Sequence, residues 1–399
     1  MTFRLGINYW PARTAMGWWA AFDRAEVAAD FARIAAAGFD SVRLFLTWED
    51  FQPEPDQPSA PMIERLVTTL ELAQAARLSV MPTLFTGHMS GVNWLPGWAL
   101  GGSDGDRRFR VVSGDRVVQQ RLRNWYADDE VLQAQELLAR ELARALAGHP
   151  ALWAWDLGNE NSNCVVPPTR AHGRDWLRRV SDAIRQGDAG ALVTVGLHME
   201  DMEHDRRLGP ADAAESCDFL TMHGYPGYAS WARGPTDEEL LPFLAIVTRW
   251  LGGGADVVFS EFGVPTYRDG DSDSAGGGGV ALVEEQAAAA YVDRALAALH
   301  ECGCVGAMLW CYSDYVPAIW RSPPFDAAVH ERFFGQWRAD ASPKPAVASV
   351  EAFARRRLAP VPVPPSTDTS FIDIEPSDIC RPDELARLYR RFCDARRGA

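Results

Sequence analysis

Residues 152–160 have the sequence Leu-Trp-Ala-Trp-Asp-Leu-Gly-Asn-Glu, an apolar run that ends in a glutamate. Residues 257–263 repeat the pattern in Val-Val-Phe-Ser-Glu-Phe-Gly. Apolar runs of this length are typical of buried strands. A carboxylate at the end of a buried strand is costly to desolvate unless it is paired or has a chemical task. If both strands belong to one sheet, Glu160 and Glu261 are expected to lie close together.

Further apolar runs of this kind alternate with amphipathic runs along the chain. The expected strands cover 5–9, 41–46, 79–85, 152–157, 192–197, 219–222, 257–260 and 307–310. The expected helices cover 26–37, 62–77, 130–147, 174–185, 237–251, 284–300 and 343–357. Strands that are nearly all followed by a helix predict an α/β fold, a (β/α)8 TIM barrel, in preference to a doubly wound sheet. A doubly wound sheet would also need a glycine-rich turn after its first strand, where this chain has Asn-Tyr-Trp-Pro at 8–11.

We expect a single barrel domain over residues 1–357, followed by a Pro-rich linker and a short helical tail over 358–399. The linker is indicated by Pro-Val-Pro-Val-Pro-Pro at 360–365, a composition typical of extended chain. Four long loops follow the third, fourth, seventh and eighth expected strands, at 86–129, 161–170, 265–280 and 311–342. All lie where strands run into helices, the face on which such barrels build active sites. The loops therefore predict a walled pocket on that face.

The composition excludes several classes of function. A net charge of −15 over 399 residues argues against nucleic acid or an anionic membrane as a partner. No apolar run is long enough to span a membrane, and no export signal precedes the first expected strand, so we expect a cytoplasmic protein. Lys344, the only lysine, lies in Ser-Pro-Lys-Pro, which excludes a Schiff-base or P-loop lysine. No cofactor is expected, and the oligomeric state stays open.

Glu160 and Glu261 each have a structural explanation. Glu160 could begin a helix, since acidic side chains favour helix starts, but Asn-Ser-Asn at 161–163 and Pro-Pro at 167–168 delay any helix. Glu261 alone could be a surface acid at a strand end. Together they carry more weight, because the fourth and seventh strands face each other across an eight-stranded barrel. Paired carboxylates are the groups that cleave glycosidic bonds.

This pattern resembles the clan A glycoside hydrolases, most of all family 5. The likeness covers residues 3–357 and rests on Asn159-Glu160 and on Glu261-Phe262-Gly263. It is supported at separate positions by Arg43, His88, His223, Tyr225 and Trp310. The resemblance implies that Glu160 is the acid/base and Glu261 the nucleophile. It also implies that the arginine, histidines and tyrosine orient and tune them, that Asn159 contacts the substrate, and that Trp310 carries the sugar.

The implied reaction is double-displacement hydrolysis of a β-glycoside with retention, without a metal or cofactor. A nucleophile has to be ionised, and we expect Arg43 and Tyr225 to keep Glu261 in that form. An acid has to start protonated, and we expect burial and the charge of Glu261 to raise the pKa of Glu160. Retention requires the two carboxyl groups to lie ~5 Å apart.

The supporting residues differ in how strongly they point to function. Arg43 lies inside an apolar run, and a buried guanidinium needs a partner, so we expect it to meet a carboxylate. The strand-end position of His223 favours a functional role over a core one, whereas for His88 the two are balanced. Trp310 and Trp94 are expected to stack on sugar rings.

Residues 198–204, His-Met-Glu-Asp-Met-Glu-His, hold five potential metal ligands. They do not match His-Glu-x-x-His, and the first expected strand supplies no further ligand, so a segment that lines the substrate cleft or is solvated is favoured over a metal site.

For the substrate, the sequence favours a β-linked oligosaccharide cleaved by an exo-acting β-mannosidase. Inside a cell an enzyme meets imported oligosaccharides and not polymers, and the 86–129 loop could close one end of a cleft. The Asn-Tyr-Trp-Pro opening also resembles clan members that act on mannosides and galactosides. The alternatives are a β-glucosidase or an endo-acting glucanase or mannanase. A non-catalytic sugar-binding barrel is a remoter alternative, against which the two glutamates argue.

Overall fold

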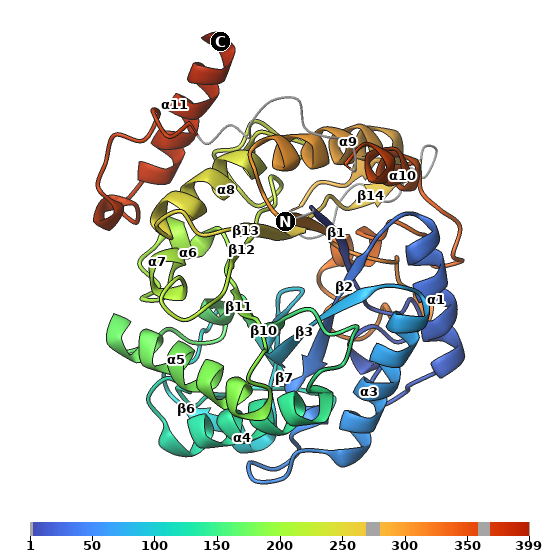
Figure 1. Ribbon diagram of the computed structural model, residues 1–399. Helices are drawn as coiled ribbons and strands as arrows, with labels where there is room; N and C mark the ends of the chain where they lie inside the picture. The colour runs from blue at the N-terminus through green and yellow to red at the C-terminus, as the bar shows by residue number, and fades with distance from the viewer. Residues whose placement is uncertain (1–2, 269–279, 358–367, 399) are drawn as a thin grey trace.

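Eight parallel strands surrounded by helices form the centre of the computed structural model, which describes residues 3–268, 280–357 and 368–398 (Figure 1). The strands are β1 (Arg4–Asn8), β2 (Ser41–Thr47), β3 (Ser79–Thr86), β10 (Trp155–Asn159), β11 (Val193–Gly196), β12 (Leu220–His223), β13 (Val257–Phe262) and β16 (Gly306–Leu309). β1 pairs with both β2 and β16. A parallel bridge between His198 and His223 joins the ends of β11 and β12, so the sheet closes on itself. The predicted (β/α)8 barrel is confirmed.

The helices cover the outside of the barrel. They are α1 (Arg24–Ala36), α3 (Ala60–Ala75), α4 (Asp129–Leu146), α5 (Arg170–Gly187), α8 (Leu240–Leu251), α9 (Glu285–Glu301) and α10 (Ala346–Arg356). After β11 the chain forms only two single turns, α6 (Glu200–Glu203) and α7 (Pro210–Ala213), in a stretch where the sequence predicted no helix. In the described part of the chain, no helix has both the length and the apolar character needed to cross a bilayer.

The interior of the barrel changes from apolar to polar towards the carboxyl ends of the strands. One buried layer consists of Met81, Ala154, Phe219, Val258 and Met308. Thr83 and Asp156 follow Met81 and Ala154 by two residues. Because alternate residues of a strand point to the same side, they also point into the barrel. The Thr83 hydroxyl donates to Asp156 at 2.8 Å inside the barrel. This polar layer lies directly below the residues at the carboxyl ends of the strands.

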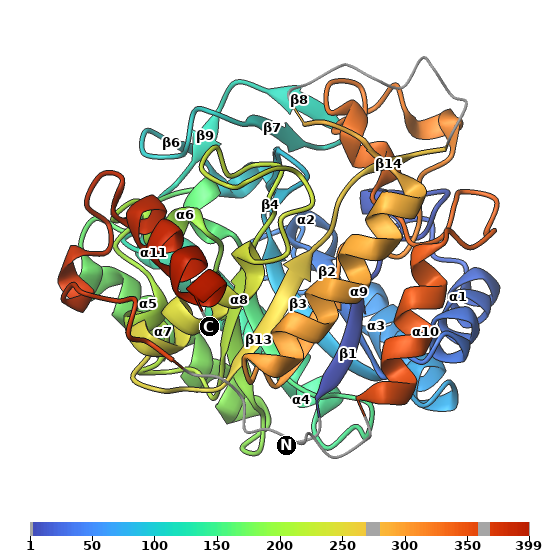
Figure 2. The same cartoon turned by 90° about the horizontal axis from the view of Figure 1, so that it is seen from above.

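The 86–129 loop forms a small sheet of its own. It contains β4 (His88–Met89), β5 (Val92–Trp94), β7 (Arg110–Ser113) and β8 (Arg116–Val118), and β6 (Leu100–Gly102) pairs separately with β9 (Arg121–Leu122) (Figure 2). Arg110 of β7 forms a bidentate ion pair with Asp326, at 2.7 and 2.8 Å. Asp326 belongs to the loop after β16, so this pair ties together two loops of the strand-end face.

The C-terminal segment ends in α11 (Glu384–Gly398), which lies at the edge of the molecule beside α6 and α8 (Figures 1 and 2). The ring of Tyr389 packs on Trp231, with centroids 5.2 Å apart, and its hydroxyl donates to Asp237 at 2.5 Å. The helical tail is therefore present and docked. The Pro-rich run at 360–365 and the glycine run at 276–279 lie outside the described residues. The division into a barrel and a tail at residue 357 stays a prediction.

Candidate active site

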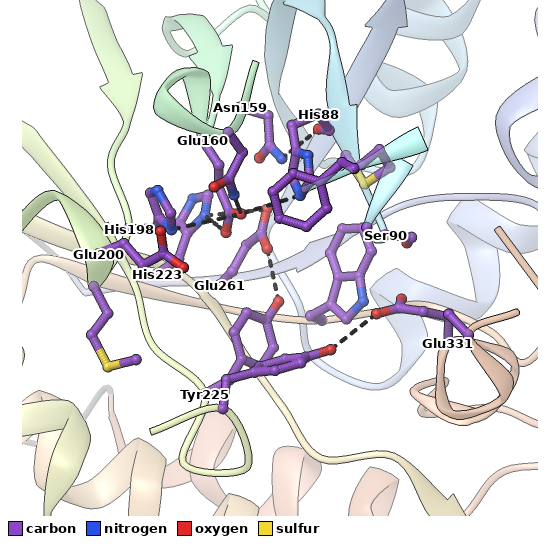
Figure 3. Close-up of a pocket in the computed structure, with 18 of the residues that line it drawn as sticks. His88, Ser90, Asn159, Glu160, His198, Glu200, His223, Tyr225, Glu261 and Glu331 are labelled. Atoms are coloured by element: carbon purple, nitrogen blue, oxygen red, sulfur yellow. Dashed lines mark hydrogen bonds and ion pairs between the residues drawn. The ribbon is translucent and has the colours of Figure 1, made fainter. Parts of the chain in front are cut away.

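Glu160 lies directly after β10 in a left-handed backbone conformation, with φ 47° and ψ 48°. For a residue other than glycine this conformation costs roughly 1–2 kcal/mol, and such strain concentrates at functional sites. The backbone N–H of Glu160 donates to the carbonyl oxygen of Gly196 at 2.9 Å, which fixes the turn. Its side chain reaches towards Glu261 among the residues that line a cavity (Figure 3).

Glu261 is buried at the carboxyl end of β13, and both of its oxygens have protein donors. Arg43 donates to Oε1, and the Tyr225 hydroxyl donates to Oε2 at 2.7 Å. One oxygen of Glu160, one oxygen of Glu261 and a ring nitrogen of His223 all lie within 4.8 Å of one another. The structure thus brings the two glutamates together at the strand-end face.

Arg43 is fully buried beneath Glu261. It donates to Asp156 at 2.9 and 2.6 Å, to Asn8 at 3.1 Å and to Asn159 at 2.8 Å. Burial alone would lower the pKa of the guanidinium, but the charges of Asp156 and Glu261 outweigh it and raise the pKa. Arg43 therefore meets two carboxylates. Sequence reasoning missed Asp156, although an aspartate inside the apolar run of Glu160 was a usable signal.

Three histidines and an amide surround the carboxylate of Glu160. His223 Nδ1 lies 3.0 Å from Oε1, and Asn163 donates to Oε2 at 3.0 Å. His198 and His88 lie 3.8 and 3.9 Å from Oε2. Burial raises the pKa of Glu160, but the charge of His198 and the hydrogen bond with His223 outweigh burial and hold the pKa below its usual value. The rise in pKa expected from the sequence is wrong for this arrangement, because the histidines outweigh burial.

Three more of the predicted site residues, Asn159, Tyr225 and Trp310, lie beside the two glutamates. Asn159 lies between Arg43 and the His88 carbonyl, to which its amide donates at 2.9 Å. Burial and the nearby Glu261 raise the pKa of Tyr225, so its hydroxyl stays a donor. Trp310 lines the cavity that contains both glutamates.

Trp94 is not brought to this cavity. It lines a second one, together with residues that include Trp48 and Glu49. Its indole N–H donates to the carbonyl oxygen of Met89, and Met89 lines the cavity of the glutamates. The β4–β5 turn therefore separates Trp94 from Glu160 and Glu261, which the sequence could not show.

No family model and no curated protein sequence matches the chain, whereas solved structures do. The exo-beta-1,4-mannosidase Op5Man5 from Opitutaceae bacterium strain TAV5 is 28% identical, with a TM-score of 0.71 over 90% of this chain and 61% of that one. GH5_18 from Streptomyces cattleya, solved with GlcNAc, is 23% identical, with a TM-score of 0.79 over 100% of this chain and 92% of that one. The chain is a glycoside hydrolase, and the solved structures it resembles include members of family 5.

The cavity of this glycosidase has a volume of about 300 Å³, and different loops form its two sides. Beyond Glu160 it is lined by the segment after β11, including His198, Glu200 and Glu203, as the sequence favoured. On the other side the loop after β16 contributes Glu331, which accepts a hydrogen bond from Tyr228 at 3.1 Å. Tyr228 and Glu331 were not singled out from the sequence, because both lie in loops without strand-end signals.

Glu160, His223 and Glu261 of the glycosidase are also residue types that bind metals. Arg43 already places a permanent positive charge on Glu261, however, and Tyr225 occupies its other oxygen. A cation between the glutamates would be repelled by the buried guanidinium. These residues fit a pair of carboxylates better than a metal centre, and the absence of a cofactor stays a prediction.

Proposed function

We propose that this glycosidase hydrolyses terminal β-mannosides of short oligosaccharides by double displacement, with retention at the anomeric carbon. The observation that carries the mechanism is the separation of the glutamates, whose nearest oxygens lie within 4.8 Å. Retaining enzymes hold their carboxyl groups ~5–5.5 Å apart, whereas inverting enzymes need ~6.5–9.5 Å to fit a water molecule. The short separation favours a nucleophile over a bound water.

In the first step, Glu261 attacks the anomeric carbon while Glu160 protonates the leaving oxygen. The hydrogen bonds from Arg43 and Tyr225 hold the Glu261 carboxylate in one orientation. The flat face of Trp310 supplies an apolar surface for the ring of the terminal sugar. In the second step, Glu160 takes a proton from water, and the resulting hydroxide displaces Glu261 from the anomeric carbon.

Similar proteins support a β-mannoside as the substrate, and two features of the site support a short oligosaccharide. Op5Man5 is an exo-beta-1,4-mannosidase, and a variant of the S. cattleya GH5_18 was solved with Manb1-4GlcNAc. The cavity of about 300 Å³ lies at the small end of the range for ligand sites, which suits a short oligosaccharide. The ion pair between Arg110 and Asp326 ties the two loops that line both the site and the second cavity. A β-glucosidase or an endo-acting enzyme is the alternative, and the cytoplasmic location stays a prediction.

A substrate panel tests this proposal directly. Aryl β-glycosides of mannose, glucose and galactose are compared with manno-oligosaccharides, cello-oligosaccharides and Manβ1-4GlcNAc. We expect the β-mannosides to have the highest kcat/KM, and release of single sugars from the non-reducing end. Proton NMR of the first product formed reports the anomer. No turnover of any β-mannoside would overturn the substrate, and an α-anomer would overturn retention.

Two variants test the roles of the glutamates. Glu261→Ala is expected to abolish turnover, because no nucleophile remains. Glu160→Ala is expected to lose ~10²–10⁴-fold on poor leaving groups, the usual contribution of a general acid. Azide should restore turnover of activated aryl glycosides by Glu160→Ala and give a β-glycosyl azide. Glu64→Ala, on the exposed face of α3, is the matched control and should behave as the wild type.

A further inference from the structure

A second polar group lies behind Glu160 and consists of His198, Ser162 and Asp201. All three residues are buried, with relative exposures of 6–7%. His198 Nε2 lies 2.9 Å from the Ser162 hydroxyl, which donates to Asp201 Oδ1 at 2.7 Å. The other oxygen of Asp201 accepts the backbone N–H of His198 at 3.0 Å. The resemblance to known glycoside hydrolases gave no role to any of these three residues.

The hydrogen bonds determine where His198 carries its protons. Ser162 has one hydroxyl hydrogen and gives it to Asp201, so it can only accept from His198. Nε2 of His198 is therefore an N–H donor in both charge states of the ring. The ring atom that can gain or lose a proton is Nδ1, and Nδ1 faces Glu160 Oε2 at 3.8 Å.

The other two histidines cannot serve in the same way. The Asn93 amide nitrogen donates to the Asn163 carbonyl, so its oxygen faces His88 Nδ1 at 2.8 Å and requires a hydrogen there. Burial lowers the pKa of His88, which keeps the ring neutral with a lone pair towards Glu160. His223 Nδ1 lies 3.0 Å from Glu160 Oε1, and among the described residues its buried Nε2 has no hydrogen-bond partner, so the ring has no second polar group behind it as His198 has.

We propose that His198 is the proton reservoir of Glu160, so that the two side chains share one proton that rests on His198 Nδ1 and passes to Glu160 for catalysis. The proposal rests on the proposed hydrolase function and adds a residue that acts through Glu160. The two atoms have to approach by about 1 Å to reach hydrogen-bond distance. Asp201, through Ser162 and the backbone of residue 198, then stabilises the charged ring.

The proton balance of the reaction follows from this pair. Nδ1 gives its proton to Glu160, which gives it to the leaving oxygen as the C–O bond breaks and Glu261 bonds to the anomeric carbon. In the second step water gives a proton to Glu160 and its hydroxide to the anomeric carbon, which releases Glu261. The proton on Glu160 returns to His198 Nδ1, so each cycle ends with the starting protonation.

The charges around His198 support a cationic ring. Burial lowers the pKa of His198, but the charges of Asp201, Glu160 and Glu200 outweigh it, and the pKa is raised. The charged and titratable groups that face the ring come from α6 and the turn after it, from the end of β10 and from β4: Asp201, Glu200, Arg206, Glu160 and His88. Burial also raises the pKa of Asp201. The charge of His198 is also the largest of the influences that lower the pKa of Glu160, the group that the proposed reaction needs as an acid.

An NMR titration tests the reservoir without any substrate. The ¹⁵N shifts of His198 in the full-length protein report whether one or both ring nitrogens carry a proton. We expect both to be protonated at pH 7 in the wild type, and the pKa of His198 to fall by about one unit, tenfold in proton affinity, in Glu160→Gln. A neutral His198 at pH 6, or a titration that Glu160→Gln does not move, would overturn the proposal.

Kinetics give the second test. At pH 7 His198→Gln should hydrolyse Manβ1-4GlcNAc about 10–100-fold more slowly through kcat, within the range of general-acid effects, with KM little changed. The loss should be at least tenfold smaller for a dinitrophenyl mannoside, whose leaving group needs no acid, and the basic limb of the pH profile should move. Equal losses on both substrates would refute the reservoir. His204→Gln, exposed at the end of the same turn, is the matched control.

Ser162→Ala covers the case in which His198→Gln does not fold. It keeps the imidazole but frees Nε2, so we expect a lower pKa of His198 in the NMR titration and a smaller, same-direction kinetic loss. An unchanged titration in Ser162→Ala would contradict the relay through Asp201. If the wild type turned over no β-glycoside while the NMR coupling of Glu160 and His198 held, the proposed function would fail and the shared proton would stand.

Discussion

Replacing Arg43 by methionine is expected to lower both the stability of the protein and the reactivity of Glu261, the proposed nucleophile. The guanidinium makes five hydrogen bonds, to Asp156, Glu261, Asn8 and Asn159, and its side chain is 0% exposed. Methionine fills a similar volume without a charge. Among the described residues, Asp156 would keep only the Thr83 hydroxyl and a long contact from the Gly158 N–H as donors, and would be left as a buried charge.

The magnitude follows from that uncompensated charge. Removing one partner of a buried ion pair costs about 3–5 kcal/mol. The entropy of unfolding, ~2.1 cal/mol/K per residue, gives roughly 0.8 kcal/mol/K for a chain of this length. The melting temperature of Arg43→Met should therefore fall by about 4–6 °C. Because Glu261 also loses a donor, kcat should fall at least tenfold, equivalent to about 1.4 kcal/mol.

Differential scanning calorimetry at pH 7 measures the stability, with two further variants. Asp156→Asn in the Arg43→Met background removes the stranded charge and should recover about a third of the loss. Arg178→Met removes an exposed arginine that pairs with Asp175 and Asp182, and should shift melting by under about 1 °C. If Arg43→Met melted within 1 °C of the wild type and Asp156→Asn gave no recovery, the buried charge of Asp156 would not depend on Arg43 and the reasoning would be wrong.

Three further predictions concern other parts of the site and its walls. Lys344→Met strands the buried Asp314, to which Lys344 donates at 2.7 Å, and should cost about 3 kcal/mol in unfolding free energy by chemical denaturation. Trp310→Ala should lower kcat/KM for β-mannosides at least tenfold by loss of the stacking surface, whereas Trp94→Ala, which lines the second cavity, should stay within threefold. Tyr225→Phe removes a charge-assisted hydrogen bond to Glu261 and should lower kcat about 10–100-fold, and a kcat unchanged by this variant would contradict that role.

The barrel, and the positions of Glu160, Glu261 and Arg43 in it, could be predicted because their sequence signals are local. Strand periodicity and the glutamates at two strand ends are properties of short segments, and barrel symmetry then places Glu160 opposite Glu261. The need of a buried guanidinium for a partner likewise predicted that Arg43 meets a carboxylate. These inferences require no knowledge of how loops fold.

The parts that could not be predicted depend on loop geometry. Trp94 follows His88 by only six residues, yet the β4–β5 turn sends the two side chains to different cavities. The pKa of Glu160 was misjudged because His198 comes from a segment that the sequence could describe only as rich in metal-ligand types. The direction of a pKa shift depends on which charges lie within a few ångströms, and that is decided by tertiary structure.

The proposed double displacement requires Glu160 to give a proton in one step and to take one in the next, and the arrangement around Arg43 helps to explain how. The charge of Glu261 lies within 4.8 Å of Glu160, and a like charge at this distance strengthens a carboxyl's hold on its proton. In the proposed mechanism, bond formation would turn Glu261 into a neutral ester, so the pKa of Glu160 would fall as Glu160 becomes a base. Arg43 would then lose one anionic partner inside the barrel. Its second partner, Asp156, is fully buried below the cavity and would keep the guanidinium neutralised through the intermediate, which accounts for a buried arginine that binds two carboxylates.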